Sequence, residues 1–344
     1  MHSSQNGTSG GIAFGGSTLP QPLLVRGTCL GCHGQGTPNK IVTIGGSEIP
    51  QVLHTDPSED LAGGNFAYIT GAKSRVTADQ NSAGHNVIDL GAAYNETILT
   101  LPPAGHGVSN TNLTCAGNNG CHGWRAFASS GSGLTSLKGA HHNNVDGKCD
   151  TLISDNNVSK FYRFLMGIKG LEITGTYKYQ NYNANNHNEY YGATTPMSVS
   201  GCGDTACHYT ATDIRPASQT ISGFCATCHG NFHTVEGIGG DISSPFTRHP
   251  TDISLPASGE YTAYTAYSTQ APVARYNGGV VPDTISPTVD PTGTADDIVM
   301  CLSCHAAHAT PYADMLRWDY STMIAGGGGS GGCFTCHTQK KNPP

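Results

Sequence analysis

Charged side chains are scarce in this sequence: they make up 12% of its 344 residues, with 17 Lys and Arg against 24 Asp and Glu. The formal charge of −7 argues against the dense basic surface that nucleic-acid binding requires. No stretch approaches the roughly 18 consecutive apolar residues of a membrane-spanning helix. Residues 1–11 also lack a basic region followed by an apolar run. We therefore expect no nucleic-acid partner, no membrane span and no signal peptide in this chain.

The sequence also has too little apolar material for an ordinary core. Hydrophobic residues amount to 37%, and 46 residues are Gly. Chains of this composition usually cannot bury enough apolar surface to fold. Abundant instead are 13 Cys and 16 His, which indicates that a bound group holds the fold together.

Twelve of the 13 cysteines form six pairs, and a histidine follows the second cysteine of every pair. Four pairs read "CLGCH", "CATCH", "CLSCH" and "CFTCH", the pattern of covalent c-type haem attachment. The two thiols add to the haem vinyl groups, and the adjacent histidine then reaches the iron. Zinc knuckles and disulfides do not require this histidine, which disfavours both. The cysteines of these four motifs are Cys29, Cys32, Cys225, Cys228, Cys301, Cys304, Cys333 and Cys336.

Two further pairs have longer spacings. "CAGNNGCH" contains Cys115 and Cys121, and "CGDTACH" contains Cys202 and Cys207. Their intervening residues include glycines, which permit a tight bulge, so we interpret both as haem sites with expanded loops. The sequence thus predicts six covalently bound haem c groups, with Cys149 left as a thiol in a turn.

The predicted proximal iron ligands are His33, His122, His208, His229, His305 and His337. Ten other histidines are enough to give every iron a second imidazole, an arrangement that lowers the redox potential relative to His/Met ligation. The predicted distal ligands are His54, His85, His142, His187, His233, His249 and His308. The pairing of each distal ligand with its haem stays open, as does the choice between His141 and His142.

Two distal candidates lie very close to a proximal ligand in sequence. His233 follows His229 by four residues, and His308 follows His305 by three. Residues this close project from one side of a local turn, whereas the two ligands of one iron approach from opposite faces. We therefore expect His233 and His308 to serve neighbouring haems, which predicts a closely packed row.

The expected fold class is a multihaem cytochrome c, mostly coil and turns, with a few short helices, minimal strand and haems forming the core. Residues 1–344 are expected to form a single continuous unit without an internal domain boundary. Apolar spacing favours a short helix at 161–168, and alternation favours a strand at 261–268. We expect six arginines to pair with haem propionates: Arg26, Arg75, Arg163, Arg215, Arg248 and Arg275.

Several segments together resemble a known family. They are "LAGGNFAYI", "GHNV", "TCAGNNGCHG", "GAHH", "YRFLMGIKGLE", "HNEYYG", "FCATCHGNFH", "SPFTRHPTDI" and "CLSCHAAHATPYADMLRWDY". The chain resembles the extracellular multihaem c-type cytochromes of metal-reducing bacteria and is similar to the OmcS-type hexahaem cytochromes that form filaments, or nanowires. The resemblance implies a homopolymer with end-to-end subunit contacts and stacked bis-His haems. It also implies redox partner cytochromes, extracellular electron acceptors and a location outside the cell or on its outer surface, reached after removal of a leader.

These observations favour long-range electron transfer without catalysis. One alternative is a monomeric periplasmic or outer-surface electron shuttle. A second is a multihaem oxyanion reductase, which would need one iron with an open position. The abundance of histidines argues against an open position.

Overall fold

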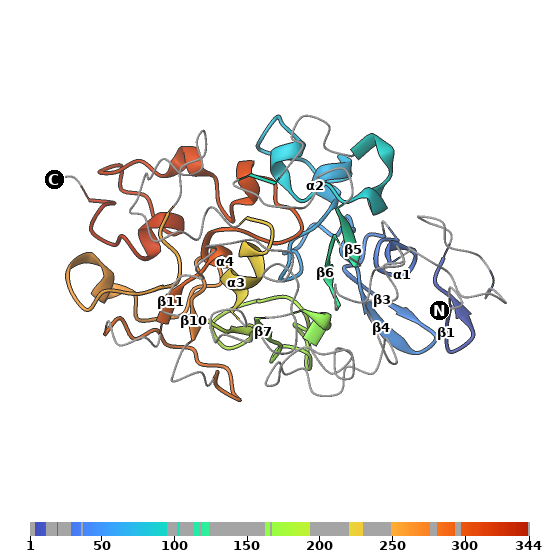
Figure 1. Ribbon diagram of the computed structural model, residues 1–344, viewed down its shortest axis with the longest axis horizontal. Coiled ribbons are helices and arrows are strands. Elements are labelled where there is room, and N and C mark those ends of the chain that lie inside the picture. The colour runs from blue at the N-terminus through green and yellow to red at the C-terminus, as the bar shows by residue number, and fades with distance from the viewer. Residues whose placement is uncertain are drawn as a thin grey trace.

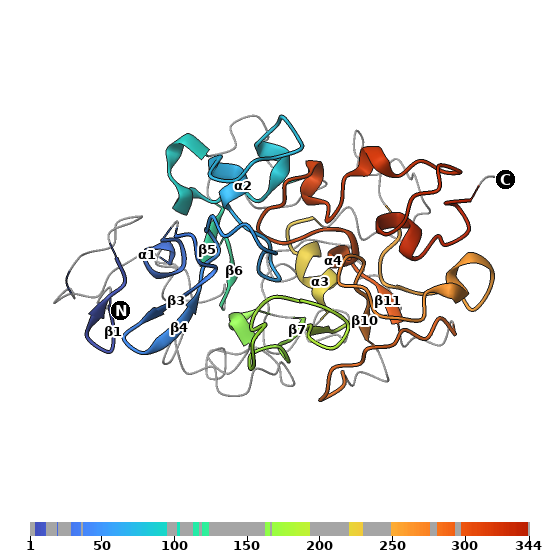
Figure 2. The same cartoon turned by 180° about the vertical axis from the view of Figure 1, so that it is seen from behind.

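The computed structural model describes residues 4–11, 19, 29–35, 37–94, 102–103, 113–116, 119–123, 162–165, 167–192, 220–229, 249–275, 281–292 and 297–342. Figures 1 and 2 show short elements joined by long irregular segments. The N-terminal elements lie toward one end of the long axis, and the C-terminus lies at the other end (Figure 1). The predicted fold class, mostly coil with short helices and little strand, is confirmed.

The helices span one or two turns. The α-helices are α1 (Leu30–His33), α2 (Ala67–Thr70), α3 (Ile221–Ala226) and α4 (Cys301–Cys304). The 3-10 helices are η2 (Asn81–Ala83), η3 (Ile88–Leu90), η4 (Ala92–Tyr94), η9 (Tyr162–Phe164), η13 (Gly259–Ala263), η14 (Ala313–Met315), η15 (Tyr320–Thr322) and η16 (Gly332–Thr335). Three of the α-helices and η16 overlap predicted haem motifs, so much of the regular structure serves to shape these motifs.

The strands form small, separate sheets. They are β1 (Ser4–Gln5), β2 (Thr8–Ser9), β3 (Ile41–Ile44), β4 (Ser47–Pro50), β5 (Thr114–Ala116), β6 (Gly120–His122), β7 (Ile168–Lys169), β8 (Glu189–Tyr190), β9 (Ile253–Ser254), β10 (Ala274–Arg275) and β11 (Asp297–Val299). The pairs β1–β2, β3–β4 and β7–β8 are antiparallel, β5–β6 is parallel, and β10–β11–β9 forms one antiparallel sheet.

Among the residues that the structure describes, apolar side chains gather in three small clusters. The first contains Leu30 of α1 and Phe66 beside α2, the second contains Ile221 of α3 and Leu302 of α4, and the third contains Tyr264. Two of the three clusters thus contain a residue from within a predicted haem motif. The packing therefore fixes the motifs relative to the rest of the chain. Within the described ranges, no helix has the length and hydropathy to cross a membrane.

Two local predictions were wrong. In the segment predicted to be a helix, Tyr162–Phe164 forms a single 3-10 turn in which Arg163 has φ 58°, and strand β7 follows. The segment predicted to be a strand begins in η13 and keeps only an isolated bridge between Ala266 and Thr288. In both places contacts with distant segments override the local pattern.

Candidate haem-binding sites

Four haem motifs form the same helical turn. In each, the histidine N–H donates to the carbonyl of the first cysteine, at 3.0 Å in Cys29–His33 and Cys225–His229, 3.1 Å in Cys301–His305 and 2.9 Å in Cys333–His337. This bond joins residues four apart, which places the first cysteine and the histidine on one face of the turn. The turn therefore presents the thiols and the imidazole together, as covalent attachment and iron ligation require.

The motif with five intervening residues reaches a related arrangement by a different backbone. Strands β5 and β6 pair in parallel, with Thr114 opposite Gly120 and Ala116 opposite His122. This register sets Cys115 directly opposite Cys121. A Cβ atom at Gly120 would lie 2.4 Å from backbone atoms of Ala116, so only glycine permits the close approach.

The third motif lies outside the described residues. Its members are Cys202, Cys207 and His208. The predicted distal ligands His142 and His233 also lie outside the described residues. The structure therefore describes five of the six predicted motifs, and ten of their twelve cysteines.

Each described proximal histidine has its Nδ1 atom bound by an oxygen atom. His33 donates to Pro50 O at 2.9 Å, His122 to Arg163 O at 2.7 Å, His229 to Pro103 O at 2.8 Å, His305 to Asp314 O at 2.6 Å and His337 to Glu260 Oε1 at 3.1 Å. A carbonyl oxygen carries no proton, so Nδ1 is the donor in the first four pairs. This fixes the tautomer and leaves Nε2 with a lone pair for a metal.

Three of these rings face a second histidine at a similar distance. The ring centroids are 6.1 Å apart for His229 and His85, 6.3 Å for His122 and His308, and 6.0 Å for His337 and His249. Two imidazoles on opposite sides of one metal, with bonds of about 2 Å, have centroids about 6 Å apart. The three separations therefore fit two axial ligands of one iron.

The opposing rings are also held in place. His85 Nδ1 donates to Ala307 O at 2.6 Å, and His249 Nδ1 donates to Pro250 O at 2.9 Å. The His308 ring lies against Gly63, where a Cβ atom would come within 2.8 Å of Nδ1. Glycine at position 63 thus makes room for the imidazole.

Burial favours the neutral form of three of the paired imidazoles, those of His85, His122 and His308. It is the main cause that lowers the pKa of His85 to about 4, of His308 to about 3 and, to a smaller extent, that of His122. The neighbouring histidine of each pair lowers the pKa of His85 and His308 further. Neutral imidazole is the form that binds metal ions, so the environment suits ligation.

The two histidines of the segment after Cys304 point to different partners. His305 is the motif histidine, whereas His308 lies opposite His122 of the second motif. The two rings of this short loop thus lie toward different motifs, and the assignment of His308 as a ligand of a neighbouring haem stays a prediction.

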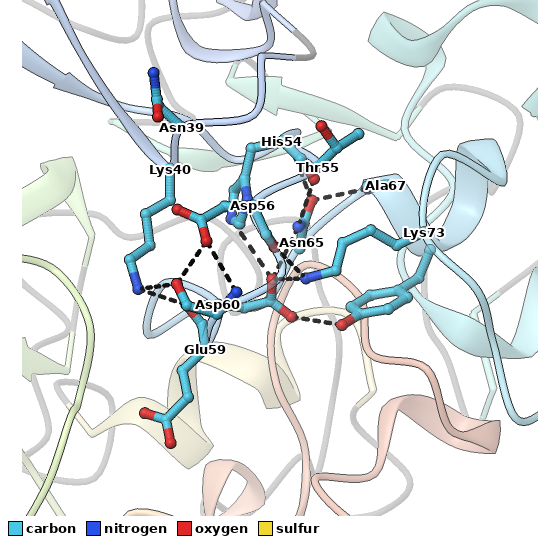
Figure 3. A network of polar contacts seen from close by, with 12 residues as sticks. Asn39, Lys40, His54, Thr55, Asp56, Glu59, Asp60, Asn65, Ala67 and Lys73 are labelled. Atoms are coloured by element: carbon cyan, nitrogen blue, oxygen red, sulfur yellow. Dashed lines mark hydrogen bonds and ion pairs between the residues drawn. The ribbon is translucent and has the colours of Figure 1, made fainter.

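The His54 side chain is buried among polar groups. It is 0% exposed, and its Nε2 lies 3.5 Å from Asp60 Oδ1. Asp60 accepts from Lys73 Nζ at 2.8 Å, and Figure 3 shows its carboxylate beside both His54 and Lys73. Burial lowers the pKa of His54 to about 4. Neither ring nitrogen makes a hydrogen bond within the described part of the chain, and Nδ1, which does not contact Asp60, is available to a further partner.

His187 has a different environment. Its Nδ1 lies 3.3 Å from Asn183 O, and its Nε2 lies 3.2 Å from Glu189 Oε1. The ring stacks on Tyr267 with a centroid separation of 3.6 Å. Both nitrogens thus contact protein oxygens, so iron ligation would require the contact between Nε2 and Glu189 to be broken. The assignment of His187 as a ligand stays a prediction.

Cysteines of successive motifs lie close together. The Cys29 thiol lies beside that of Cys115, which lowers the pKa of Cys29 and raises that of Cys115, and the Cys225 thiol lies beside that of Cys301, which raises the pKa of Cys225. Cys121 lies near enough to Cys225 to raise the pKa of the Cys225 thiol. Cys304 likewise lies near both cysteines of the last motif. Haems attached to these sulfur atoms are therefore neighbours.

One predicted propionate partner is engaged elsewhere. Arg275 pairs with Glu189 Oε2 at 3.1 Å and with Asp297, and all three side chains are buried. It also donates to the carbonyl oxygens of Ser286 and Thr288. The prediction that Arg275 pairs with a propionate was wrong, because buried carboxylates already neutralise its charge.

Comparison with known proteins places these sites in context. The family described as "Doubled CXXCH motif" matches residues 294–342, which contain the fifth and sixth haem motifs. The chain is 25% identical to the C-type cytochrome OmcS of Geobacter sulfurreducens, over 90% of this chain and 76% of that protein.

Two solved structures are also similar. One is the outer membrane cytochrome S filament from Geobacter sulfurreducens, at 19% identity and a TM-score of 0.45, covering 100% of this chain and 90% of the other. The second is the OmcS nanowire from the same organism, at 20% identity and a TM-score of 0.38, covering 82% of this chain and 72% of the other.

The donor set fits c-type haem. Paired thiols stand beside each of the five described motif histidines, the Nδ1 atoms of these histidines are anchored, and three of their imidazoles face a second ring. These findings support covalently bound c-type haem, and the chain is similar to the OmcS-type multihaem c-type cytochromes.

Proposed function

We propose that this protein carries electrons over long distances outside the cell through six closely packed bis-His c-type haems. It does so as the subunit of a polymeric cytochrome filament and has no catalytic activity of its own. The observation that carries this proposal is the set of three opposed histidine pairs with centroids 6.0–6.3 Å apart. Such pairs fill both axial positions of an iron and leave no position for a substrate.

The proposed axial pairs are His85 with His229, His122 with His308, and His249 with His337. Three motif histidines then lack an assigned partner: His33, His208 and His305. The remaining predicted ligands number four: His54, His142, His187 and His233. One of the four is therefore surplus, and the contacts of both ring nitrogens of His187 favour it as the one that does not bind iron.

The sulfur contacts support an order for the haems. The proposed row passes the proximal ligands in the sequence His33, His122, His229, His305 and His337. Its links are the contacts between Cys29 and Cys115 and between Cys225 and Cys301, together with the longer-range proximity of Cys121 to Cys225 and of Cys304 to Cys333 and Cys336. Close porphyrin edges allow an electron to pass from each haem to the next.

The row runs through a unit built from distant parts of the chain. His308 N–H donates to Gly63 O at 2.6 Å, and His85 N–H donates to His308 O at 3.0 Å. These contacts support one continuous unit over residues 1–344. We propose that copies of this unit join end to end, and that partner cytochromes and extracellular acceptors exchange electrons with the filament. The filament structures of the similar cytochrome support this assembly and an extracellular or outer-surface location.

The proposal is tested on the haem-loaded protein. Intact mass and a pyridine haemochrome assay count the haems, and six per chain is the expected result. Cryo-electron microscopy then distinguishes filaments from single particles, which would indicate a monomeric shuttle. A high-spin optical band in the unmodified protein would indicate an open iron and favour an oxyanion reductase.

A further inference from the structure

One proximal histidine differs from the others in the group that binds its Nδ1 atom. Four of the five described proximal rings donate to neutral backbone carbonyls. His337 instead has its Nδ1 3.1 Å from Oε1 of Glu260, a carboxylate 77 residues earlier in the chain. The motif concerned, Cys333–His337, lies within the segment that matches the doubled motif family.

The carboxylate is positioned by the surrounding structure. Glu260 belongs to η13, and its side chain is 13% exposed. The Thr338 hydroxyl donates to the carbonyl oxygen of Glu260, which ties η13 to the residue after the ligand. The Tyr261 ring packs edge-on against His337 with centroids 5.3 Å apart. The second carboxylate oxygen, Oε2, is buried and makes no hydrogen bond within the described residues. The negative charge is thus directed at the imidazole.

An anionic acceptor changes what the imidazole offers to a metal. It draws the Nδ1 proton more strongly than a neutral carbonyl does, which makes the ligand more basic at Nε2. A more basic ligand stabilises ferric over ferrous iron, and second-shell hydrogen bonding is one of the main controls of haem potential. Burial strengthens this effect because little water screens the charge.

We propose that Glu260 is a positioning and tuning residue that gives the haem at Cys333–His337 the lowest redox potential of the five described sites. This inference rests on the proposed haem with His337 as its ligand. The site lies at the end of the proposed row, so Glu260 sets the driving force with which electrons enter or leave that end.

The first test compares the haem-loaded Glu260→Gln variant with the unmodified protein by spectroelectrochemical titration. The amide oxygen still accepts the hydrogen bond, so fold and ligation are retained while the charge is removed. The expected result is that one haem moves to a higher potential and five do not move. Glu48→Gln is the matched control. Glu48 lies on strand β4, is exposed and pairs with Lys178. Strand β4 and the C-terminal segment lie toward opposite ends of the molecule in Figure 1. The Glu48→Gln variant should leave the titration unchanged.

A titration of Glu260→Gln that superimposes on that of the unmodified protein would overturn the proposal. The haem count of the peptide containing Cys333 and Cys336 tests the underlying assignment separately. If this peptide carries no haem, the proposed function fails at this site; if it carries haem and the potential does not move, only the role of Glu260 fails.

A second measurement needs no variant. The His249 and His337 rings are inclined at 78°, whereas the other two pairs are inclined at 42° and 44°. Nearly perpendicular imidazoles leave the iron d orbitals that share the unpaired electron almost equal in energy, which gives a strongly anisotropic low-spin signal in electron paramagnetic resonance. During stepwise reduction this signal should outlast those of the less inclined pairs. Its early loss would contradict the proposal.

Discussion

The Nδ1–H of His85 donates a hydrogen bond to the carbonyl oxygen of Ala307, 2.6 Å away and 222 residues further along the chain. The adjacent backbone N–H of His85 donates to His308 O, and His308 N–H donates to Gly63 O. Hydrogen bonds between the segments that contain His85, Gly63 and Ala307–His308 therefore hold both of these proposed distal ligands. Because His85 faces the fourth motif and His308 faces the second, the same set of hydrogen bonds fixes the positions of the second and fourth sites relative to each other.

Replacement of His85 by Ala should open one axial position without loss of haem. The thioether bonds to Cys225 and Cys228 do not involve His85, so the haem count per chain should be unchanged. The iron opposite His229 should become high-spin, since its second ligand is absent. Optical and paramagnetic resonance spectra should show one high-spin haem and no change in the others.

The control for this change is Asn86→Ala. Asn86 follows His85 directly and is buried, and its side chain donates to Asn81 O at 3.2 Å. Its loss perturbs the same segment but removes no imidazole. High-spin iron in Asn86→Ala, or low-spin iron throughout in His85→Ala, would contradict the proposed pairing.

Gly120→Ala should damage the second haem site. The new Cβ atom would meet the Ala116 backbone at 2.4 Å, so strands β5 and β6 must separate, at a cost of about 1–3 kcal/mol. Separation would move Cys121 and His122 away from Cys115. Peptide mass spectrometry should find less haem on the peptide containing Cys115 and Cys121.

Gly329→Ala provides the comparison for that variant. Its nearest contact would be the Phe334 ring at 3.2 Å, and a side chain can shift where a backbone cannot. Its haem content should equal that of the unmodified protein at every motif. Full occupancy in Gly120→Ala would show that the strands tolerate a side chain there.

The haem motifs could be predicted from sequence because their structure depends on residues that are close together in the chain. A turn from first cysteine to histidine needs no distant partner, and four motifs form it in the same way. The three-residue spacing of His305 and His308 likewise indicated that the two rings point to different neighbours, and the His308 ring faces His122. Local chemistry was sufficient in these cases.

The partners of the ligands could not be predicted in the same way. Pro103 O binds His229 across 126 residues, and Glu260 binds His337 across 77. Any residue supplies a carbonyl, so no sequence pattern marks one as an acceptor. The alternating pattern near Tyr261 favoured a strand, but packing of Tyr264 and Tyr267 into a buried cluster gives η13 instead. The proposed role of Glu260 depends on the formation of η13, which contains this residue.

Glu189→Gln should destabilise the fold. Glu189 is 0% exposed and pairs with Arg275, while Ser286 N–H donates to Oε1 at 2.7 Å. Removal of one partner of a buried ion pair typically costs about 3–5 kcal/mol. Denaturant unfolding of the haem-loaded protein measures this loss. Glu48→Gln, which removes an exposed charge, should change stability by less than about 1 kcal/mol.

Acid should remove the contribution of Glu189. Burial raises its pKa, but the hydrogen bond with His187, the charge of Arg275 and the Ser286 N–H outweigh burial, so the pKa is lowered from 4.5. A lowered pKa in the folded state means that the stabilisation is present above about 4.5 and disappears as the pH falls through the folded-state value. Stability below pH 4.5 should therefore fall more steeply in the unmodified protein than in Glu189→Gln. Equal slopes would show that this carboxylate does not contribute.

His54→Gln and His187→Gln should give opposite results, although both side chains are 0% exposed. The ring nitrogens of His54 make no hydrogen bond within the described residues, and the contact of Nε2 with Asp60 is long, at 3.5 Å, so this buried imidazole suits a metal ligand. His54→Gln should therefore produce one high-spin haem. The ring nitrogens of His187 contact Asn183 and Glu189, so His187→Gln should keep every haem low-spin and lower only the unfolding free energy. Spin state is read from optical spectra of both variants at equal haem content. High-spin iron in His187→Gln would restore His187 as a ligand and make one of the other three candidates surplus.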